Sequence, residues 1–284
     1  MAIERVGVVG LGTMGGGIAQ LCIEAGFATV GREVSLDLGE RARGRVAHFL
    51  ARKVEKGQLE QGADEAAVAK LSLTTEIGDL AECDLVIEAA FEDLAVKQGL
   101  FRELEAAVRP DAILATNTSA LSVTQIAAAV ERPGRVVGMH FFNPAPLMPL
   151  VEVVRAERTA EDVFEAAFAF AERLGKQPIR CNDTPGFVVN RILIPLLNDC
   201  VRVLDEAGVT VEDLDKAMKH GAGWPMGPAT LLDLVGADIH VHASEALYEK
   251  LREPRMAPPP RLVRMVQAGK LGRKSGEGFH TYDD

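Results

Sequence analysis

The sequence is poor in cysteine, in aromatic residues and in positive charge. Its 284 residues include four cysteines, one tryptophan and two tyrosines, and the formal net charge at pH 7 is −10. The cysteines are scattered and form neither a CxxC pair nor a Cys/His ligand spacing, so we expect neither a disulfide framework nor a bound metal. The excess of acidic residues argues against general nucleic-acid binding, and an anionic substrate would require a local basic patch.

Long apolar runs are also lacking. No stretch approaches the roughly 20 apolar residues that span a bilayer, and the opening segment MAIERVGVVG shows a strand pattern instead of a basic region followed by an apolar signal core. We therefore expect a cytoplasmic protein with no membrane partner. The hydrophobic content of 48% supplies a packed core, and the length suits two domains.

The first two-thirds of the chain alternate strand patterns with helical patterns, which is typical of a parallel sheet covered by helices on both faces. Amphipathic patterns predict long helices from about Leu38 to Lys56 and from Asp93 to Val108. Short apolar segments predict strands near residues 5–9, 27–32, 84–88, 112–116, 136–141, 150–154 and 178–181. The predicted class is α/β, with an N-terminal Rossmann-type parallel-sheet domain over residues 1–183.

Strand patterns stop after the turn segment Asp183-Thr184-Pro185-Gly186. The stretch from Phe187 to Glu206 predicts one long apolar-rich helix, kinked at Pro195, and helical patterns continue to about Ala268. The sequence therefore predicts an all-α C-terminal domain over residues 184–284.

Two ionisable residues stand inside apolar strand patterns. His140 follows Val136-Val137-Gly138-Met139, and Glu152 lies within Leu150-Val151-Glu152-Val153-Val154. Each side chain would lose solvation if buried alone, and a hydrogen bond between them would relieve both. Such a pair holds the imidazole in one tautomer and makes it more basic, as a proton-transfer catalyst near neutral pH requires. A single histidine in a strand can equally be a satisfied core residue, so the interpretation depends on the rest of the chain.

A glycine-rich turn joins the first strand pattern to an apolar helix pattern. It reads Gly10-Leu11-Gly12-Thr13-Met14-Gly15, which is the GxGxxG order of a dinucleotide-binding turn. Gly10 permits the tight turn, Gly12 lets the pyrophosphate approach the backbone, and Gly15 allows close packing of helix and strand. Glu33, at the end of the next predicted strand, is placed to bind the ribose 2′-hydroxyl and to repel a 2′-phosphate. NAD is therefore expected over NADP, although the neighbouring Arg32 could partly accommodate NADP.

Several longer motifs follow one another along the chain. They read Asn117-Thr118-Ser119-Ala120-Leu121-Ser122, His140-Phe141-Phe142-Asn143-Pro144, Pro185-Gly186-Phe187-Val188-Val189-Asn190-Arg191, Gly223-Trp224-Pro225-Met226-Gly227-Pro228 and Leu271-Gly272-Arg273-Lys274-Ser275-Gly276-Glu277-Gly278-Phe279. In this order they resemble the motifs of the short-chain 3-hydroxyacyl-CoA dehydrogenase family, over nearly the whole chain. The resemblance implies reversible, NAD-dependent oxidation of a short-chain (3S)-3-hydroxyacyl-CoA, such as 3-hydroxybutyryl-CoA, to the 3-oxoacyl-CoA.

The resemblance implies catalytic roles for four residues. His140 would take the proton of the 3-hydroxyl group as hydride leaves C3, and Glu152 would orient the ring and stabilise the imidazolium. Ser119 would hydrogen-bond the reacting oxygen or the thioester, and Asn190 would complete the polar grip on the substrate. Taken singly, Ser119 could begin a turn or cap a helix, and Asn190 could be a local backbone partner.

The resemblance also implies contacts to the cofactor and to the acyl carrier. The implied NAD contacts are Gly10, Gly12, Thr13, Met14, Gly15, Glu33, Glu92, Lys97, Asn117, Ser119, Asn143 and Lys274. Lys53 and Lys56, at the end of the first long helix, would meet the phosphates of coenzyme A. The family often carries a serine a few residues earlier, where this chain has Leu50 and Ala51. Glu92 and Lys97 also suit a helix without any ligand, through the helix dipole and as a solvated charge.

Three other functions stay open. The same scaffold could act on a hydroxyacyl group tethered to an acyl carrier protein. The 3-hydroxyacid dehydrogenases share an opening that reads like GLGTMG, but His140 and Glu152 argue against the lysine chemistry used there. A non-catalytic cofactor-binding relative would be expected to lack one of the four catalytic residues.

By analogy with the family, the helical domain would form a homodimer. An intrachain core could explain the same apolar pattern. The residues that could serve either purpose are Ile192, Leu193, Leu196, Leu197, Val201 and Leu204.

Overall fold

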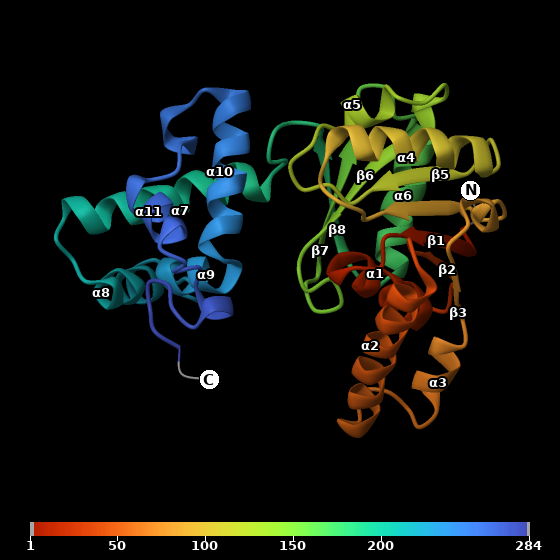
Figure 1. Cartoon of the computed structure of the whole chain (residues 1–284), viewed down its shortest axis with the longest axis horizontal. Helices are drawn as coiled ribbons and strands as arrows, with labels where there is room; N and C mark the ends of the chain where they lie inside the picture. The colour runs from red at the N-terminus through yellow and green to blue at the C-terminus, as the bar shows by residue number, and fades with distance from the viewer. Residues whose placement is uncertain (1–2, 283–284) are drawn as a thin grey trace. The chain divides into compact units, whose positions relative to one another are not determined.

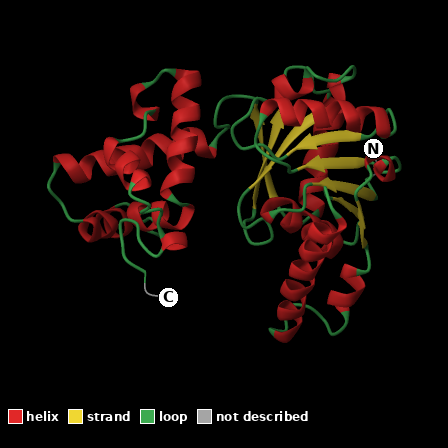
Figure 2. Cartoon of the chain, viewed as in Figure 1, coloured by secondary structure: helices red, strands yellow, loops and turns green. Residues whose placement is uncertain are grey.

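The computed structural model describes residues 3–282 of the chain. It consists of two compact units, which meet in the chain between Thr184 and Pro185. Figure 2 shows that the first unit contains the strands together with several helices, whereas the second is built of helices and loops. The predicted class, a parallel-sheet domain followed by a helical domain, is confirmed.

Within the described residues, an eight-stranded sheet forms the centre of the first unit. Its strands lie in the order β3-β2-β1-β4-β5-β6-β7-β8, and every neighbouring pair is parallel except β6 and β7. The strands are β1 Arg5–Val9, β2 Ala28–Arg32, β3 Leu71–Thr74, β4 Leu85–Glu88, β5 Ile113–Thr116, β6 Val136–Phe141, β7 Leu150–Arg155 and β8 Gln177–Asn182. The sequence predicts all of these except β3, a four-residue edge strand that is too short to show a clear pattern.

Helices cover both faces of this sheet. Figure 1 shows α4 and α5 on one side and α1 and α2 on the other. The helices are α1 Thr13–Glu24, α2 Leu36–Glu55, α3 Ala63–Val68, α4 Leu94–Ala107, α5 Val123–Ala127 and α6 Glu161–Arg173. Side chains of α1, α2 and α6, among them Ile18, Val46 and Phe170, share one hydrophobic core with the strands. Because β4, β5 and β6 are buried along their whole length, their sequences read as apolar runs without alternation.

The connection between β6 and β7 is short and comprises residues 142–149. A crossover between parallel strands needs about a dozen residues or more, so β7 returns antiparallel beside β6. In the resulting register, His140 lies directly opposite Glu152. β8 then pairs in parallel with the far side of β7.

Helices make up the second unit. They are α7 Val189–Glu206, α8 Val211–Lys216, α9 Pro228–Val235, α10 Ala237–Leu251 and α11 Pro260–Gln267, with a π-helical turn over Ala217–Gly221. Leu197 of α7, Leu232 of α9 and Leu262 of α11 meet in its core. The helix predicted from Phe187 begins two residues later, because Phe187 takes a left-handed backbone conformation with φ of 47°. In the part of the chain that the structure describes, no helix is both long and apolar enough to cross a membrane.

Candidate active site

The carboxyl ends of the central strands gather the segments that the sequence singled out. β1 runs into the glycine-rich turn, β4 into the segment that holds Glu92, and β5 into the segment that holds Ser119. His140 is the last residue but one of β6. Because β1, β4, β5 and β6 are parallel neighbours, these segments lie together at the carboxyl ends of the strands, where open α/β sheets bind their ligands.

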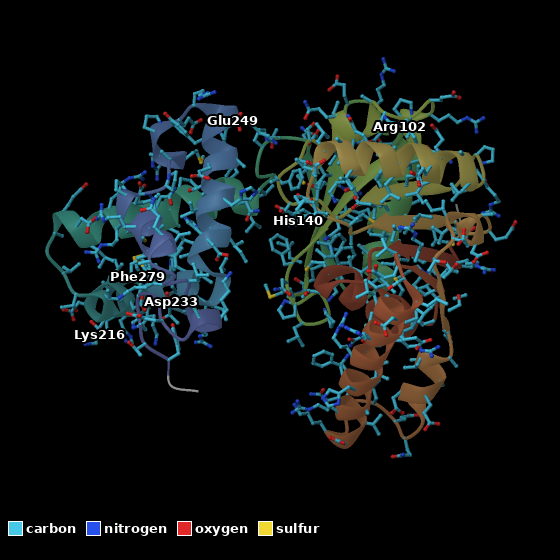
Figure 3. All side chains as sticks on the ribbon, in the orientation of Figure 1. Arg102, His140, Lys216, Asp233, Glu249 and Phe279 are labelled. Atoms are coloured by element: carbon cyan, nitrogen blue, oxygen red, sulfur yellow. The ribbon has the colours of Figure 1, made fainter. Side chains whose placement is uncertain are left out.

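A buried histidine and a buried carboxylate lie side by side at this end of the sheet. Nδ1 of His140 lies 2.7 Å from Oε2 of Glu152, and the two residues are 6% and 0% exposed. The ring of Phe142 packs against the imidazole, with 4.5 Å between the ring centroids. Since a carboxylate only accepts hydrogen bonds, Nδ1 must donate, which leaves Nε2 as the basic nitrogen of the neutral ring. Figure 3 labels His140 where β6 presents it.

Asn117 holds the backbone beside His140. Its Oδ1 accepts a hydrogen bond of 2.9 Å from the N–H of Phe141, and its own N–H donates to the carbonyl of Glu88. The side chain therefore ties the end of β5 to the end of β6. The sequence motif predicts that Asn117 belongs to the site, but it does not indicate this positioning contact.

Glu92 organises the segment that carries Ser119. Its Oε1 accepts hydrogen bonds from Oγ1 of Thr118 at 2.5 Å, from the N–H of Ser119 at 2.9 Å and from the N–H of Ala120 at 3.2 Å. Burial opposes ionisation of Glu92, but nearby Lys97 and these hydrogen bonds outweigh it and hold the pKa of the carboxyl below its ordinary value. Ser119 is thus presented from a turn that is fixed by a carboxylate.

Lys97 is enclosed within the first unit. The residue is 1% exposed, and its Nζ lies 2.6 Å from Oε1 of the fully buried Glu88 and 3.3 Å from Oε2 of Glu92. Glu88 also accepts a hydrogen bond of 2.7 Å from Oγ1 of Thr116. The sequence analysis misses Glu88, although an acid that ends the apolar strand LVIE is the same kind of signal that Glu152 gives.

The glycine-rich turn has the shape that its sequence predicts. Gly10 has a positive φ of 84°, and a Cβ on Gly15 would lie 1.7 Å from the carbonyl oxygen of Gly10. A Cβ on Gly12 would meet no atom within 4 Å, so the backbone is open at the point where α1 begins. This arrangement fits the close approach of a pyrophosphate to a helix N-terminus.

Glu33 lies beside this turn. Its Oε1 accepts a hydrogen bond of 2.6 Å from the N–H of Leu11, and its Oε2 accepts one of 2.9 Å from the N–H of Val34. The neighbouring Arg32 is directed elsewhere, because its Nε donates to the carbonyl of Thr75 at 3.2 Å.

A cavity of about 580 Å³ adjoins the turn, between α1, α2 and the segment 143–147. Its apolar wall includes Phe49 and Leu147. The basic residues that line it are Arg45, Arg52, Lys53 and Lys56. Lys53 forms an ion pair with Glu24 of α1. Across residues 3–282, by contrast, Arg52 and Lys56 take part in no ion pair, so both charges remain available to an anion.

Lys176 holds the segment that carries Asn143. Its buried Nζ donates hydrogen bonds of 2.7 Å to the carbonyl of Ala145 and 2.9 Å to the carbonyl of Met148. Burial, with a smaller contribution from the charge of Lys53, lowers the pKa of Lys176. The sequence analysis misses this lysine, because nothing in its local pattern indicates which carbonyls it reaches.

Two predicted site residues belong to the second unit. Asn190 lies in the first turn of α7 and is partly buried. Lys274 lies in a short 3₁₀ turn, Arg273–Ser275, and forms an ion pair of 2.6 Å with Oδ1 of Asp238 on α10.

Comparisons with known proteins identify relatives of both units. Residues 5–184 match the model of the 3-hydroxyacyl-CoA dehydrogenase NAD-binding domain, and residues 186–282 match that of the C-terminal domain. A 3-hydroxybutyryl-CoA dehydrogenase of Mycobacterium tuberculosis is 46% identical over 283 residues, which cover 99% of each chain. The mitochondrial hydroxyacyl-coenzyme A dehydrogenase of Rattus norvegicus is 40% identical over 287 residues, which cover 99% of this chain and 91% of the relative.

A solved structure shares the whole architecture. The (S)-3-hydroxybutyryl-CoA dehydrogenase of Ralstonia eutropha superposes with a TM-score of 0.96 over 100% of both chains, at 39% identity. The resemblance that the motifs predict is thereby confirmed. The chain belongs to the 3-hydroxyacyl-CoA dehydrogenase family and is an NAD-dependent dehydrogenase.

Proposed function

We propose that this enzyme reversibly oxidises a short-chain (3S)-3-hydroxyacyl-CoA, such as 3-hydroxybutyryl-CoA, to the 3-oxoacyl-CoA. The observation that carries the proposal is the hydrogen bond of 2.7 Å between His140 and Glu152. It lies at the carboxyl end of the parallel strands, which also holds the glycine-rich turn. The names of the relatives from Mycobacterium tuberculosis and Ralstonia eutropha support the choice of substrate.

His140 acts as the general base of the oxidation. Nε2 accepts the proton of the 3-hydroxyl group, and Glu152 stabilises the imidazolium that forms. Bound NAD would supply the acceptor for the hydride of C3. In the reverse direction the imidazolium of His140 returns the proton to the oxygen. The complete burial of Glu152 strengthens its attraction to the charged ring, because little solvent screens the pair.

Ser119 and Asn190 are the further polar groups assigned to the substrate. The turn that Glu92 fixes presents Ser119, which would hydrogen-bond the reacting oxygen or the thioester. Asn190 receives its role from the family motif alone. Both assignments are part of the proposal.

The residues of the glycine-rich turn fit NAD. Gly12 leaves the backbone open for the pyrophosphate, and Glu33 supplies a carboxylate for the ribose and against a 2′-phosphate. Because the carbonyl of Thr75 engages Arg32, its guanidinium is drawn away from the role that would favour NADP. The remaining proposed contacts are Thr13, Met14, Glu92, Lys97, Asn117, Asn143 and Lys274. Among these, Lys97 would contribute through Glu92, since its ammonium is enclosed.

The cavity beside α2 is proposed to take the nucleotide end of coenzyme A. Lys56 and Arg52 are the available cations, whereas Lys53 would have to leave Glu24 before it could bind a phosphate. Of Leu50 and Ala51, which stand where the family often has a serine, Leu50 is fully buried in the core. The apolar wall of the cavity suits the rest of the carrier.

The test is an NAD-reduction assay with 3-hydroxybutyryl-CoA, the matching pantetheine thioester and an acyl-carrier-protein thioester. We expect the coenzyme A thioester to be preferred, and Lys56→Ala to raise its KM by roughly 10-fold without changing that of the pantetheine thioester. Arg102→Ala, on α4 and outside the cavity, is the matched control (Figure 3). A preference for the carrier-protein thioester would mean that an acyl carrier protein, and not coenzyme A, carries the substrate.

A homodimer through the second unit is also proposed, by analogy with the family. Of the residues that could build either a core or an interface, Leu197, Val201 and Leu204 are buried within the unit itself. Ile192 is 62% exposed and remains available to a partner subunit. Sedimentation of the full chain should show a dimer, and Ile192→Asp should weaken it, whereas a monomer at all concentrations would exclude it.

A further inference from the structure

Gly31 leaves a space in the middle of β2 that Leu11 fills. A Cβ on Gly31 would lie 2.7 Å from Cδ1 and 3.2 Å from Cδ2 of Leu11, and the shorter distance is closer than real side chains allow. Leu11 itself is 1% exposed. The φ of Gly31 lies outside the left-handed region, so a side chain at this position would be opposed by the terminal methyl groups of Leu11 and not by backbone strain.

The backbone of Leu11 is held at the same place from two other directions. Its N–H donates to Oε1 of Glu33 at 2.6 Å, and its carbonyl accepts from Nη2 of Arg45 at 3.1 Å. The N–H of the preceding Gly10 donates to the carbonyl of Arg32 at 2.9 Å. The main chain of Leu11 is thus hydrogen-bonded by Glu33 and Arg45, and its side chain packs against Gly31 of β2.

Leu11 is the central residue of the stretch Gly10–Gly12, whose backbone must receive the pyrophosphate. Interiors are close-packed, so a leucine that is displaced by a new methyl group moves its own main chain or forces its neighbours apart. A shift of Leu11 would also lengthen its bonds to Glu33 and Arg45. A displacement that the buried side chain of Leu11 does not absorb would therefore move the backbone that binds the cofactor.

We propose that Gly31 and Arg45 are positioning residues for the cofactor. The space at Gly31 accommodates the side chain of Leu11, and Arg45 donates a hydrogen bond to the carbonyl of Leu11. The glycine-rich turn is therefore in its binding conformation before NAD binds. The two residues contact the turn from the protein side and act on the cofactor through Leu11. The proposal depends on NAD binding alone and not on the acyl substrate.

The decisive measurement is the Kd for NAD, by calorimetry on the full chain without acyl substrate. Gly31→Ala should raise this Kd by roughly 5- to 100-fold, because the added methyl displaces Leu11. In the Leu11→Ala background, which empties the space, the same substitution should change the Kd by less than about 3-fold. Gly44→Ala is the matched control, since a Cβ at that position of α2 would meet nothing within 4 Å. Equal losses in the two backgrounds, or a lowered Tm with an unchanged Kd, would overturn the role of Gly31.

Arg45→Met provides a second arm that adds no volume beside Leu11. It should raise the Kd for NAD by roughly 3- to 10-fold through loss of the bond to the carbonyl. Because Arg45 also lines the cavity, the variant should in addition raise the KM of the coenzyme A thioester, an effect that Gly31→Ala should not share. An unchanged NAD affinity in folded Arg45→Met would remove Arg45 from the proposal. Failure of the proposed acyl chemistry would leave both NAD measurements intact.

Discussion

Among residues 3–282, each of the two units buries one histidine, and the partners of these two histidines differ in charge. His140 of β6 is 6% exposed and bonds Glu152 at 2.7 Å, whereas His240 of α10 is 2% exposed and bonds Oδ1 of Asn198 at 2.8 Å. Burial and bond length are nearly the same. The partner carries a charge in the first case and is a neutral amide in the second.

The partner decides what each ring can do. Burial lowers the pKa of His240 from 6.5 to about 4, because Asn198 offers no charge to offset the lost solvation of an imidazolium. Glu152 offers that charge to His140, so the protonated ring that catalysis requires can form. A buried histidine therefore indicates a catalyst only together with its partner, and the comparison can be tested from either side.

The largest expected effect is on turnover. His140→Gln should lower kcat by about 10²- to 10⁴-fold, because it removes the general base, and should leave NAD affinity nearly unchanged. His240→Gln is the matched control, and should lower Tm while kcat of the folded protein is retained. Near-full activity in a folded His140→Gln variant would contradict the mechanism.

Loss of the charge alone should come next. Glu152→Gln keeps the shape of the partner, and we expect it to lower kcat, because the charge that stabilises the imidazolium is lost. Its effect should be non-additive with His140→Gln, with a coupling of about 1–3 kcal/mol, because the two side chains act as one unit. An unchanged kcat in the folded Glu152→Gln variant, or fully additive losses, would exclude the pair.

Stability in mild acid should report on His240. Its pKa is lower in the folded state, so below pH 6.5 the unfolded chain binds a proton that the folded chain refuses. The contribution of neutral His240 to the free energy of unfolding is fully present above pH 6.5. It is lost as the pH falls toward about 4, by up to about 3 kcal/mol. Urea unfolding of the full chain at a series of pH values measures this loss. His240→Gln should flatten the dependence, and an unchanged slope would assign the acid sensitivity to other groups.

The smallest effect should be the recovery of stability at lower pH when Asn198 receives a charge. Its Nδ2 donates to Oγ of Ser244 at 2.7 Å and to the carbonyl of Arg255 at 3.1 Å, and a carboxylate cannot replace these bonds. Asn198→Asp should therefore cost about 3–5 kcal/mol at pH 8, because it leaves an uncompensated buried charge. Because a protonated His240 could then pair with the new charge, part of the loss should be recovered at pH 6. No recovery would show that a carboxylate partner is insufficient to hold a charge on this ring.

The sequence predicts the parts of the site that are local. The glycine-rich turn is one continuous segment, and the apolar runs around His140 and Glu152 identify two buried strands. The short connection between them indicates an antiparallel return, whereas the register that places His140 opposite Glu152 is set by the fold. Where the residues of a motif lie within a few positions of one another, the sequence predicts the local structure.

Contacts between distant elements could not be predicted in the same way. Lys97 reads as a solvated helical charge, yet the fold encloses it against Glu88 of the neighbouring strand. Gly31 reads as a weak point in a strand, and only the packing of Leu11 explains it. Both depend on which side chain a separate element brings to the same place, and helical or strand periodicity carries no information about that.

The pairing of β6 with β7 ties the catalytic geometry to the lifetime of the sheet. Both strands are flanked by further strands, β5 and β8, so neither can fray as an edge would. Hydrogen bonds inside a sheet open through larger cooperative unfolding events. On heating, His140 and Glu152 should therefore stay together for as long as the first unit remains folded, and activity lost at lower temperatures must be lost elsewhere. The rate of amide exchange at His140 then measures how often the enzyme is without its base.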